Sequence, residues 1–216
     1  MLLLDSALAS DAQRAAELGY VSGATTNPTL IAQSGQPARE VIAMLLATLP
    51  GPVFYQPVGT TSEAIVAEGR AIASLDPSRV VLKLPCTLAG LAAGARLRGE
   101  VDYGFTAVFT PAQVIVAAAA GGRYVLPYLN RLTRLVGDGP GIIRQLASVA
   151  RGLELVVASI KSPEEAVAAL AAGAHRLTLP LAVLEAMAHS PLTELALEEF
   201  QRASPPPTSA TTGHAP

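Results

Sequence analysis

Two lysines stand out in this chain of 216 residues, because nearly every other basic residue is an arginine. The sequence holds fifteen lysines and arginines, and only Lys83 and Lys161 are lysines. A lysine amine condenses with a ketone to form a Schiff base, which an arginine cannot do because its guanidinium stays protonated. Lys83 lies inside the apolar run VVLKLP at 80–85, so its amine is the first candidate for covalent chemistry.

The position of Lys83 within its run predicts where the amine points. Side chains alternate between the two faces of a strand, so Lys83 shares a face with Val81. If the opposite, leucine-bearing face packs on helices, Lys83 points into the interior of a barrel. Loss of solvation there lowers the pKa of an amine and leaves it neutral often enough to attack a carbonyl. The alternative is a structural lysine paired with a carboxylate such as Asp5.

Eight short apolar runs alternate with amphipathic stretches along the chain. In the stretches between the runs, apolar residues recur at intervals of three and four, which is typical of helices that cover a sheet. A strand followed by a helix, eight times over, predicts an α/β fold that is a single (β/α)8 TIM barrel. The runs cover residues 2–5, 23–25, 53–58, 80–85, 103–109, 124–129, 153–159 and 176–181.

A polar residue closes each of these runs. The carboxyl ends of the strands of an α/β barrel meet at one face, where active sites lie, so these residues are candidates for a site. Polar strand ends are also expected wherever a strand meets a loop, so the pattern alone proves no chemistry. The residues are Asp5, Asn27, Gln56, Lys83, Thr106, Tyr128, Ser159 and Thr178.

The segments after the eighth run predict an extra helix and a tail. LAVLEAMAHS and PLTELALEEFQRAS keep a helical period, whereas the ending SPPPTSATTGHAP is rich in proline and small polar residues. We therefore expect a barrel domain with a C-terminal helix at 1–203 and a disordered tail at 204–216.

Composition excludes several classes of function. A formal net charge of −2 gives no reason to expect a nucleic-acid or membrane partner. No apolar run is long enough to span a bilayer, and the single cysteine, Cys86, fits a reducing cytoplasm and a buried, inert thiol. Histidines, cysteine and carboxylates are not grouped, so we expect no metal and no cofactor. Glu164 and Glu165 open a helix, where acids favour the dipole, and are interpreted as structural.

Eight segments of the chain resemble, in register, the signature segments of the transaldolase family. The likeness is greatest to its small branch, which contains the fructose-6-phosphate aldolases. It implies a TIM barrel, Schiff-base chemistry without a cofactor, sugar phosphates and ketones as substrates, and homo-oligomeric rings such as pentamers and decamers. The segments are LLLDS, ATTNPTLIA, VFYQPVGTT, VVLKLPCTLAGLAA, GFTAVFTPAQ, YVLPYLNRL, VVASIKSPEEA and LTLPLAVLEAM.

The resemblance implies a chemical role for each matched residue. Lys83 matches the Schiff-base lysine. Asp5 matches the acid that handles the proton of the hydroxyl beside the broken bond. Asn27 and Thr106 match groups that bind substrate hydroxyls and the catalytic water, and Thr26 adjoins Asn27 in the segment TTNP.

The resemblance also implies a phosphate site. Arg131 and Ser159 match the residues that hold the phosphate of the aldehyde half, and Lys161 lies where other members carry Arg or Lys. Arg131 offers a planar fork that suits phosphate, whereas Lys161 acts as a point charge.

Gln56 and Tyr128 separate the two activities of the family. By this resemblance, transaldolases carry Glu at the position of Gln56 and commonly Phe at the position of Tyr128. Fructose-6-phosphate aldolases carry Gln and Tyr there, as this chain does. Gln56 orients a water but cannot take its proton, and Tyr128 offers a hydroxyl for general acid/base catalysis. We expect an aldehyde-lyase that cleaves fructose 6-phosphate to dihydroxyacetone and glyceraldehyde 3-phosphate. Two alternatives remain: a transaldolase that has drifted at both positions, and a barrel that binds a sugar phosphate without turnover.

Overall fold

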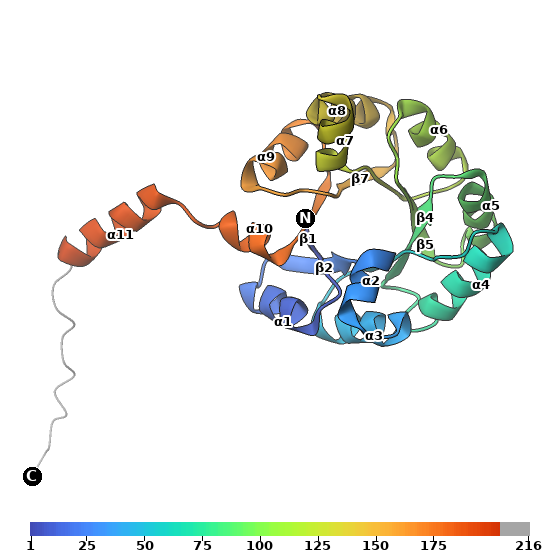
Figure 1. The fold of residues 1–216 in the computed structure, drawn as a ribbon, viewed down its shortest axis with the longest axis horizontal. Coiled ribbons are helices and arrows are strands. Elements are labelled where there is room, and N and C mark those ends of the chain that lie inside the picture. The colour runs from blue at the N-terminus through green and yellow to red at the C-terminus, as the bar shows by residue number, and fades with distance from the viewer. Residues whose placement is uncertain (204–216) are drawn as a thin grey trace, which may run out of the picture.

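The computed structural model describes residues 1–203, which form a closed barrel of eight parallel strands within a ring of helices (Figure 1). This confirms the predicted TIM barrel with an additional C-terminal helix. The predicted tail at 204–216 lies outside the described residues. The strands are β1 (Leu2–Asp5), β2 (Val21–Thr25), β3 (Val53–Tyr55), β4 (Val80–Pro85), β5 (Asp102–Thr106), β6 (Tyr124–Leu126), β7 (Glu154–Val157) and β8 (Arg176–Leu179).

The helices follow the predicted alternation, with two additions. Neither α2 nor α7 was expected as a separate helix, and the run at 124–129 is a strand only as far as Leu126. Pro127 lacks an N–H for the sheet, and α7 begins two residues later. The helices are α1 (Ala9–Leu18), α2 (Pro28–Ser34), α3 (Ala38–Thr48), α4 (Ser62–Ala73), α5 (Leu88–Leu97), α6 (Pro111–Ala119), α7 (Leu129–Val136), α8 (Gly139–Val149), α9 (Pro163–Ala171), α10 (Leu181–Ala186) and α11 (Pro191–Ala203).

The two faces of β4 pack as the alternation of its side chains predicts. Leu82 and Leu84 are buried in the large core between the sheet and the helices. Val81 belongs to a second apolar cluster, in which the rings of Phe54 and Tyr124 meet edge to face at 5.1 Å. The residues of this second cluster lie on the face of the strands that points away from the helices, and they form an apolar layer inside the barrel. Lys83 shares the face of Val81, two residues further along β4.

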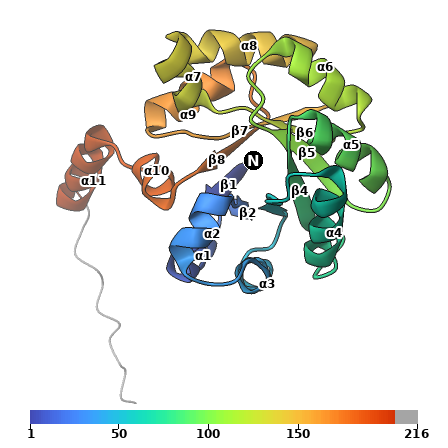
Figure 2. The same cartoon turned by 45° about the vertical axis from the view of Figure 1, so that its right-hand side comes forward.

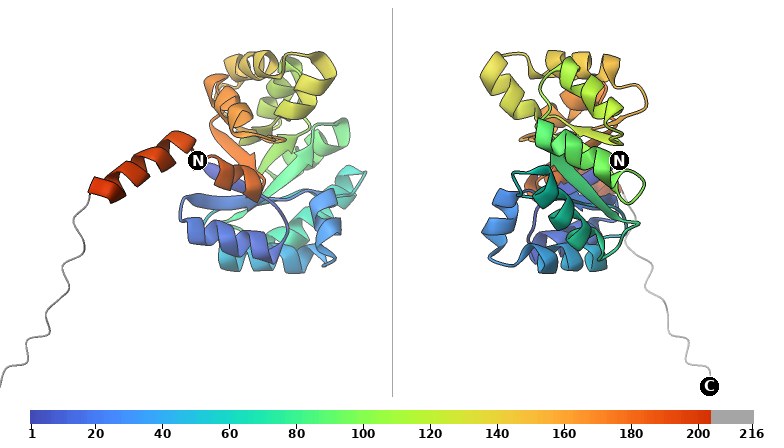
Figure 3. Two further views of the ribbon diagram at one scale, coloured as in Figure 1. Left: turned by 60° about the vertical axis from the view of Figure 1, so that its left-hand side comes forward. Right: turned by 90° about the vertical axis from the view of Figure 1, so that its right-hand side faces the viewer.

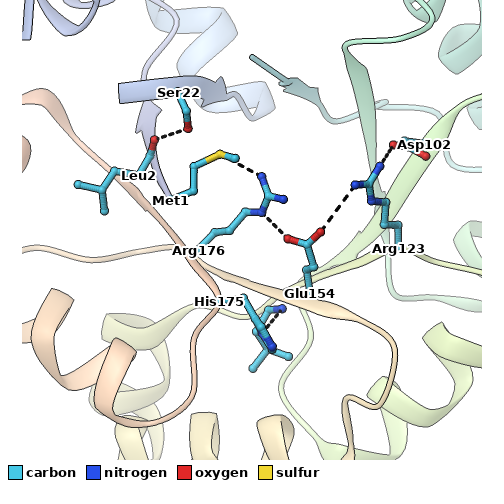
Figure 4. A network of polar contacts seen from close by, with 9 residues as sticks. Met1, Leu2, Ser22, Asp102, Arg123, Glu154, His175 and Arg176 are labelled. Carbon is cyan, nitrogen blue, oxygen red and sulfur yellow. Dashed lines mark hydrogen bonds and ion pairs between the residues drawn. The ribbon is translucent and has the colours of Figure 1, made fainter. Parts of the chain in front are cut away.

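Charged side chains close the amino-terminal end of the barrel (Figure 4). Glu154, the first residue of β7, accepts a hydrogen bond from the Arg176 guanidinium at the start of β8. Glu154 also lies 3.8 Å from Arg123, which pairs with Asp102 at the start of β5. Both guanidinium groups stack on the ring of Tyr124, at 5.1 and 5.6 Å from its centroid. Paired charges therefore line this end of the barrel, opposite the carboxyl ends of the strands.

Helix α11 stands away from the barrel in Figures 1 and 2 and in the left panel of Figure 3. None of its residues is buried, and Leu192 and Leu195 are 76% and 55% exposed. Within residues 1–203, no helix combines the length and apolar character needed to cross a bilayer.

Candidate active site

A pocket of about 570 Å³ opens at the carboxyl end of the barrel strands. Eight of the ten residues expected to form a site line it. Those expected to do chemistry are Asp5, Gln56, Lys83 and Tyr128. Those expected to bind substrate are Asn27, Arg131, Ser159 and Lys161. Thr26 and Thr106 do not line it, but each forms a hydrogen bond with a lining residue, Thr26 with Lys83 and Thr106 with Tyr128.

Lys83 sits at the base of the pocket and is almost fully withdrawn from water. Its side chain is 2% exposed, and its Nζ donates a 2.8 Å hydrogen bond to the carbonyl of Thr26. Burial lowers the pKa of the amine from 10.5 to about 8, although the nearby carboxylate of Asp5 acts in the opposite direction. The amine is therefore neutral in an appreciable fraction of molecules near neutral pH.

Asp5 is held beside this amine by two buried threonines. The Thr25 hydroxyl donates to Asp5 Oδ1 at 2.9 Å and lies 2.6 Å from the hydroxyl of Thr178. Since the single proton of Thr25 goes to Asp5, Thr178 donates to Thr25. Thr178, the polar residue that closes the eighth run, therefore helps to orient the carboxylate from within the barrel.

Tyr128 projects from the amino-terminal end of α7 and is held by three contacts. Its hydroxyl lies 2.7 Å from Oγ1 of Thr106, which is 1% exposed at the end of β5. The Arg131 guanidinium lies over its ring at 4.9 Å, and Phe109 meets the ring edge to face. These contacts fix the phenol at the pocket wall, with Thr106 as its hydrogen-bond partner.

Thr26 and Asn27 act through different atoms. The Thr26 hydroxyl donates to the carbonyl of Phe54 within the sheet, and its own carbonyl holds the amine of Lys83. The side-chain oxygen of Asn27 caps α2 by accepting from the N–H of Leu30 at 3.0 Å. This leaves the amide NH₂ of Asn27 as a donor for the pocket.

Helix α2 adds two polar residues that the sequence analysis missed. Thr29 and Gln33 both line the pocket. They are four residues apart and so lie on one face of the helix. The spacing of these two polar residues, directly after TTNP, could have predicted that they face the site.

The basic side of the pocket is built from two separate elements. Arg131 comes from α7, whereas Ser159 and Lys161 come from the loop after β7. Ser159 has a left-handed backbone with φ of 59°, which is uncommon for a residue other than glycine. Its carbonyl accepts a 2.8 Å hydrogen bond from the N–H of Asn130, which ties the loop to α7.

Gln56 is carried by a loop that is anchored to the following helix. Glu68 of α4 accepts hydrogen bonds from the Tyr55 hydroxyl at 2.5 Å and from the N–H groups of Val58 and Gly59 at 3.1 Å. Burial, together with the Glu68 carboxylate, raises the pKa of Tyr55. Glu68 therefore fixes both sides of Gln56 in the chain.

Cys86 follows the lysine strand, half-buried, and burial raises the pKa of its thiol. This agrees with the interpretation of an unreactive cysteine, because the thiolate is the nucleophile. Among residues 1–203, no group of three or more His, Cys, Asp or Glu side chains is arranged to hold a metal ion.

Comparison with known proteins identifies the family. The family model of transaldolase/fructose-6-phosphate aldolase matches residues 2–212. The chain belongs to this family. A relative from Heliobacterium modesticaldum, named probable transaldolase, is 39% identical over 202 residues, covering 91% of this chain and 94% of its own. A second relative of that name, from Aquifex aeolicus, is 36% identical over 202 residues, covering 91% and 93%.

Solved structures of lower identity share the barrel architecture with this transaldolase/fructose-6-phosphate aldolase family member. Inosine 5′-monophosphate dehydrogenase from Legionella pneumophila superposes with a TM-score of 0.58 at 17% identity, covering 80% of this chain and 54% of that chain. A designed cube-shaped protein cage gives 0.61 at 12% identity, covering 94% and 76%. At these identities the likeness shows the fold alone.

Substitution of Lys83 by methionine is expected to stabilise the fold in a pH-dependent way. The folded protein binds the proton of the Lys83 amine less tightly than the unfolded chain, because burial lowers its pKa to about 8. The resulting destabilisation is complete below pH 8 and disappears as the pH rises toward 10.5. Lys83→Met should therefore raise the free energy of unfolding at pH 7 by up to about 3 kcal/mol.

Urea denaturation at a series of pH values measures this gain. Lys161→Met, at the exposed lysine, is the matched control and should change stability by less than about 0.5 kcal/mol. A Lys83→Met gain that is absent at pH 7, or that stays constant up to pH 10.5, would contradict the burial of a titrating amine.

Proposed function

We propose that this protein is a Schiff-base aldolase that reversibly cleaves fructose 6-phosphate to dihydroxyacetone and glyceraldehyde 3-phosphate. The observation that carries the proposal is the buried Lys83 amine with its lowered pKa, at the base of an open pocket and beside Asp5. A neutral amine in that setting attacks a ketone, and the iminium that forms accepts the electrons of the breaking carbon–carbon bond.

In the proposed mechanism, each step is assigned to a residue that lines or adjoins the pocket. Lys83 adds to the ketone carbon and loses water to form the iminium. Asp5 takes the proton of the neighbouring hydroxyl as the bond breaks, releasing the aldehyde and leaving an enamine on Lys83. Tyr128 supplies the proton that converts the enamine back to an iminium. A water held by Gln56 and Thr106 then adds to this iminium and returns a proton to the Tyr128 phenolate, and the adduct collapses to free dihydroxyacetone and the Lys83 amine. The proton left on Asp5 replaces the one consumed when the first iminium formed.

The basic side of the pocket suits the phosphorylated half of the substrate. Arg131 and Lys161 provide two cations, and Ser159 provides a hydroxyl, all on one pocket wall. A phosphate accepts charge-assisted hydrogen bonds from such groups. Asn27 offers its amide NH₂ to the hydroxyls between the phosphate and the ketone.

The second candidate is a transaldolase, which passes the enamine to a second aldehyde instead of protonating it. The names of the relatives from Heliobacterium and Aquifex favour this reaction. The residues of this chain favour release, because Tyr128 offers a phenolic proton in the same pocket as the amine and Gln56 cannot act as a base.

Borohydride trapping tests the shared chemistry. Incubation with dihydroxyacetone followed by reduction should attach one three-carbon unit to Lys83, found by peptide mapping. Lys161, the other lysine of the chain, is an internal control and should stay unmodified. Lys83→Met should give no adduct and no turnover. An adduct at another residue, or none on the wild-type protein, would contradict the mechanism, and sugar-phosphate binding without turnover would support a binding-only barrel.

Two substitutions test which reaction follows the enamine. Tyr128→Phe removes the proposed proton donor, and Gln56→Glu introduces a carboxylate where the amide now lies. Release of free dihydroxyacetone from fructose 6-phosphate should fall by about 100-fold in Tyr128→Phe, since general acid/base groups contribute on this scale.

Transfer to an added acceptor aldehyde separates the two activities. It should fall much less than release in Tyr128→Phe and rise relative to release in Gln56→Glu. A wild-type protein that turns over only when an acceptor aldehyde is present would establish the transaldolase instead.

We also propose that the chain assembles into rings of five or ten copies, with α11 packing on a neighbouring copy. Leu192, Leu195 and Phe200 fall on one side of this helix, which stands off its own barrel (Figure 3). Light scattering should give five or ten times the 22.1 kDa chain mass. Leu195→Glu should shift the population to smaller species, whereas Glu198→Gln, outside the apolar stripe, should not. A wild-type mass of one chain would contradict the assembly.

A further inference from the structure

Glu165 bridges the two elements that carry the basic side of the pocket. Its Oε1 accepts a 2.7 Å hydrogen bond from the side-chain amide of Asn130 on α7. Its Oε2 accepts a 2.7 Å hydrogen bond from the backbone N–H of Lys161 in the loop after β7. The two oxygens of this carboxylate therefore accept hydrogen bonds from two different elements, α7 and the loop after β7.

The two partners of Glu165 adjoin the cations that face the pocket. Asn130 directly precedes Arg131, and the second partner is the N–H of Lys161 itself. One backbone link, between the N–H of Asn130 and the carbonyl of Ser159, already joins the same segments at 2.8 Å. The carboxylate adds a second link on the far side of Ser159, so the segments have two points of attachment and cannot pivot about one.

The negative charge of Glu165 has an energetic cost at this position. A carboxylate close to a phosphate-binding wall repels the ligand through its charge. Its neighbour Glu164 already provides a negative charge in the first turn of α9, where the helix dipole favours it, and is exposed. Both carboxylates lie in the first turn of α9, and Glu165 in addition joins the two segments of the basic side of the pocket.

We propose that Glu165 is a positioning residue that sets the separation of Arg131 and Lys161 and thereby the preference for phosphorylated over unphosphorylated aldehydes. The inference rests on the proposed function, in which these cations hold the phosphate. Glu165 itself does not touch the substrate; it acts through the geometry of the wall. A phosphate needs both cations at once, whereas an unphosphorylated aldehyde needs neither.

Four variants separate positioning from charge and from helix capping. Glu165→Ala removes both hydrogen bonds, and Asn130→Ala removes one of them from the other side. Glu165→Gln keeps the shape: its carbonyl oxygen can accept from the Lys161 N–H, and its NH₂ can donate to Asn130 once that amide flips. Glu164→Ala is the matched control, since it removes the same charge from the same helical turn.

The direct measurement is calorimetric binding of glycerol 3-phosphate, which reports the phosphate site without turnover. Glu165→Ala should weaken binding about tenfold, as expected for the loss of two hydrogen bonds to a charged group. Asn130→Ala should weaken it in the same direction, and the double variant should add little. Glu165→Gln and Glu164→Ala should stay within about twofold of wild type.

Kinetics provide the second measurement. With dihydroxyacetone as donor, Glu165→Ala should raise KM for glyceraldehyde 3-phosphate by about tenfold, the factor expected for glycerol 3-phosphate binding. For unphosphorylated glyceraldehyde, both kcat and KM should change by less than about twofold. Equal losses for both aldehydes, or equal effects of Glu164→Ala and Glu165→Ala, would overturn the inference. So would glycerol 3-phosphate binding that is absent in wild type or unchanged in both Glu165→Ala and Asn130→Ala.

The outcomes for Glu165 are distinguishable from failure of the proposed function. Borohydride trapping of dihydroxyacetone on Lys83 should be unchanged in all four variants, because the three-carbon donor carries no phosphate. Absence of trapping in the wild-type protein defeats the Schiff-base mechanism, whereas intact trapping with unaltered phosphate binding in Glu165→Ala defeats only the role of Glu165.

Discussion

Burial of the Lys83 amine is the constraint on which the site depends. An ammonium group loses its hydration at this position, and the loss lowers the pKa of the amine to about 8. The barrel compensates the charged form only in part, through the carbonyl of Thr26 and the carboxylate of Asp5. Strong compensation would restore the ordinary pKa and remove the neutral amine that we propose as the nucleophile, whereas the absence of compensation would destabilise the fold. The two buried threonines contribute to this balance, because they hold the Asp5 carboxylate in place and the distance between the two charges determines their attraction.

The barrel supplies the rigid part of the site, and its loops are tied down separately. After each odd-numbered strand, a side chain from the next helix reaches back to the loop. Asp11 accepts from Ser6, Glu68 from the loop that carries Gln56, Gln113 from the N–H of Phe109, and Glu165 from the N–H of Lys161. Most of these bonds satisfy backbone groups that the strand has left unpaired. The same device that completes the hydrogen bonding of the fold thus places Gln56 and Lys161 at the pocket.

The barrel and the direction of Lys83 were predictable from the sequence, because both follow from periodicity. The alternation within VVLKLP places Lys83 opposite Leu82 and Leu84, and eight repeats of strand and helix close the sheet. Helices α2 and α7 were not predicted because each begins within a motif that we interpreted as the end of a strand. The contacts of Glu165 and Glu68 were not predictable, since they join side chains to loop N–H groups whose positions depend on the closed barrel. Residue type alone therefore selected the groups that we propose to react and several threonines beside them, but not the loop contacts of Glu68 and Glu165.

Competitive labelling of the two lysines measures the central quantity directly. A small acylating reagent applied between pH 6 and pH 11 modifies only the neutral amine, and exposed Lys161 serves as the internal reference for reagent reactivity. The labelling of Lys83 should follow a titration with a midpoint near pH 8 in the wild-type protein. The midpoint should move to lower pH when Asp5 is replaced by Asn, because the Asp5 carboxylate raises the pKa of the amine. A midpoint at the ordinary lysine value of 10.5 would contradict the buried, partly neutral amine on which the site is built.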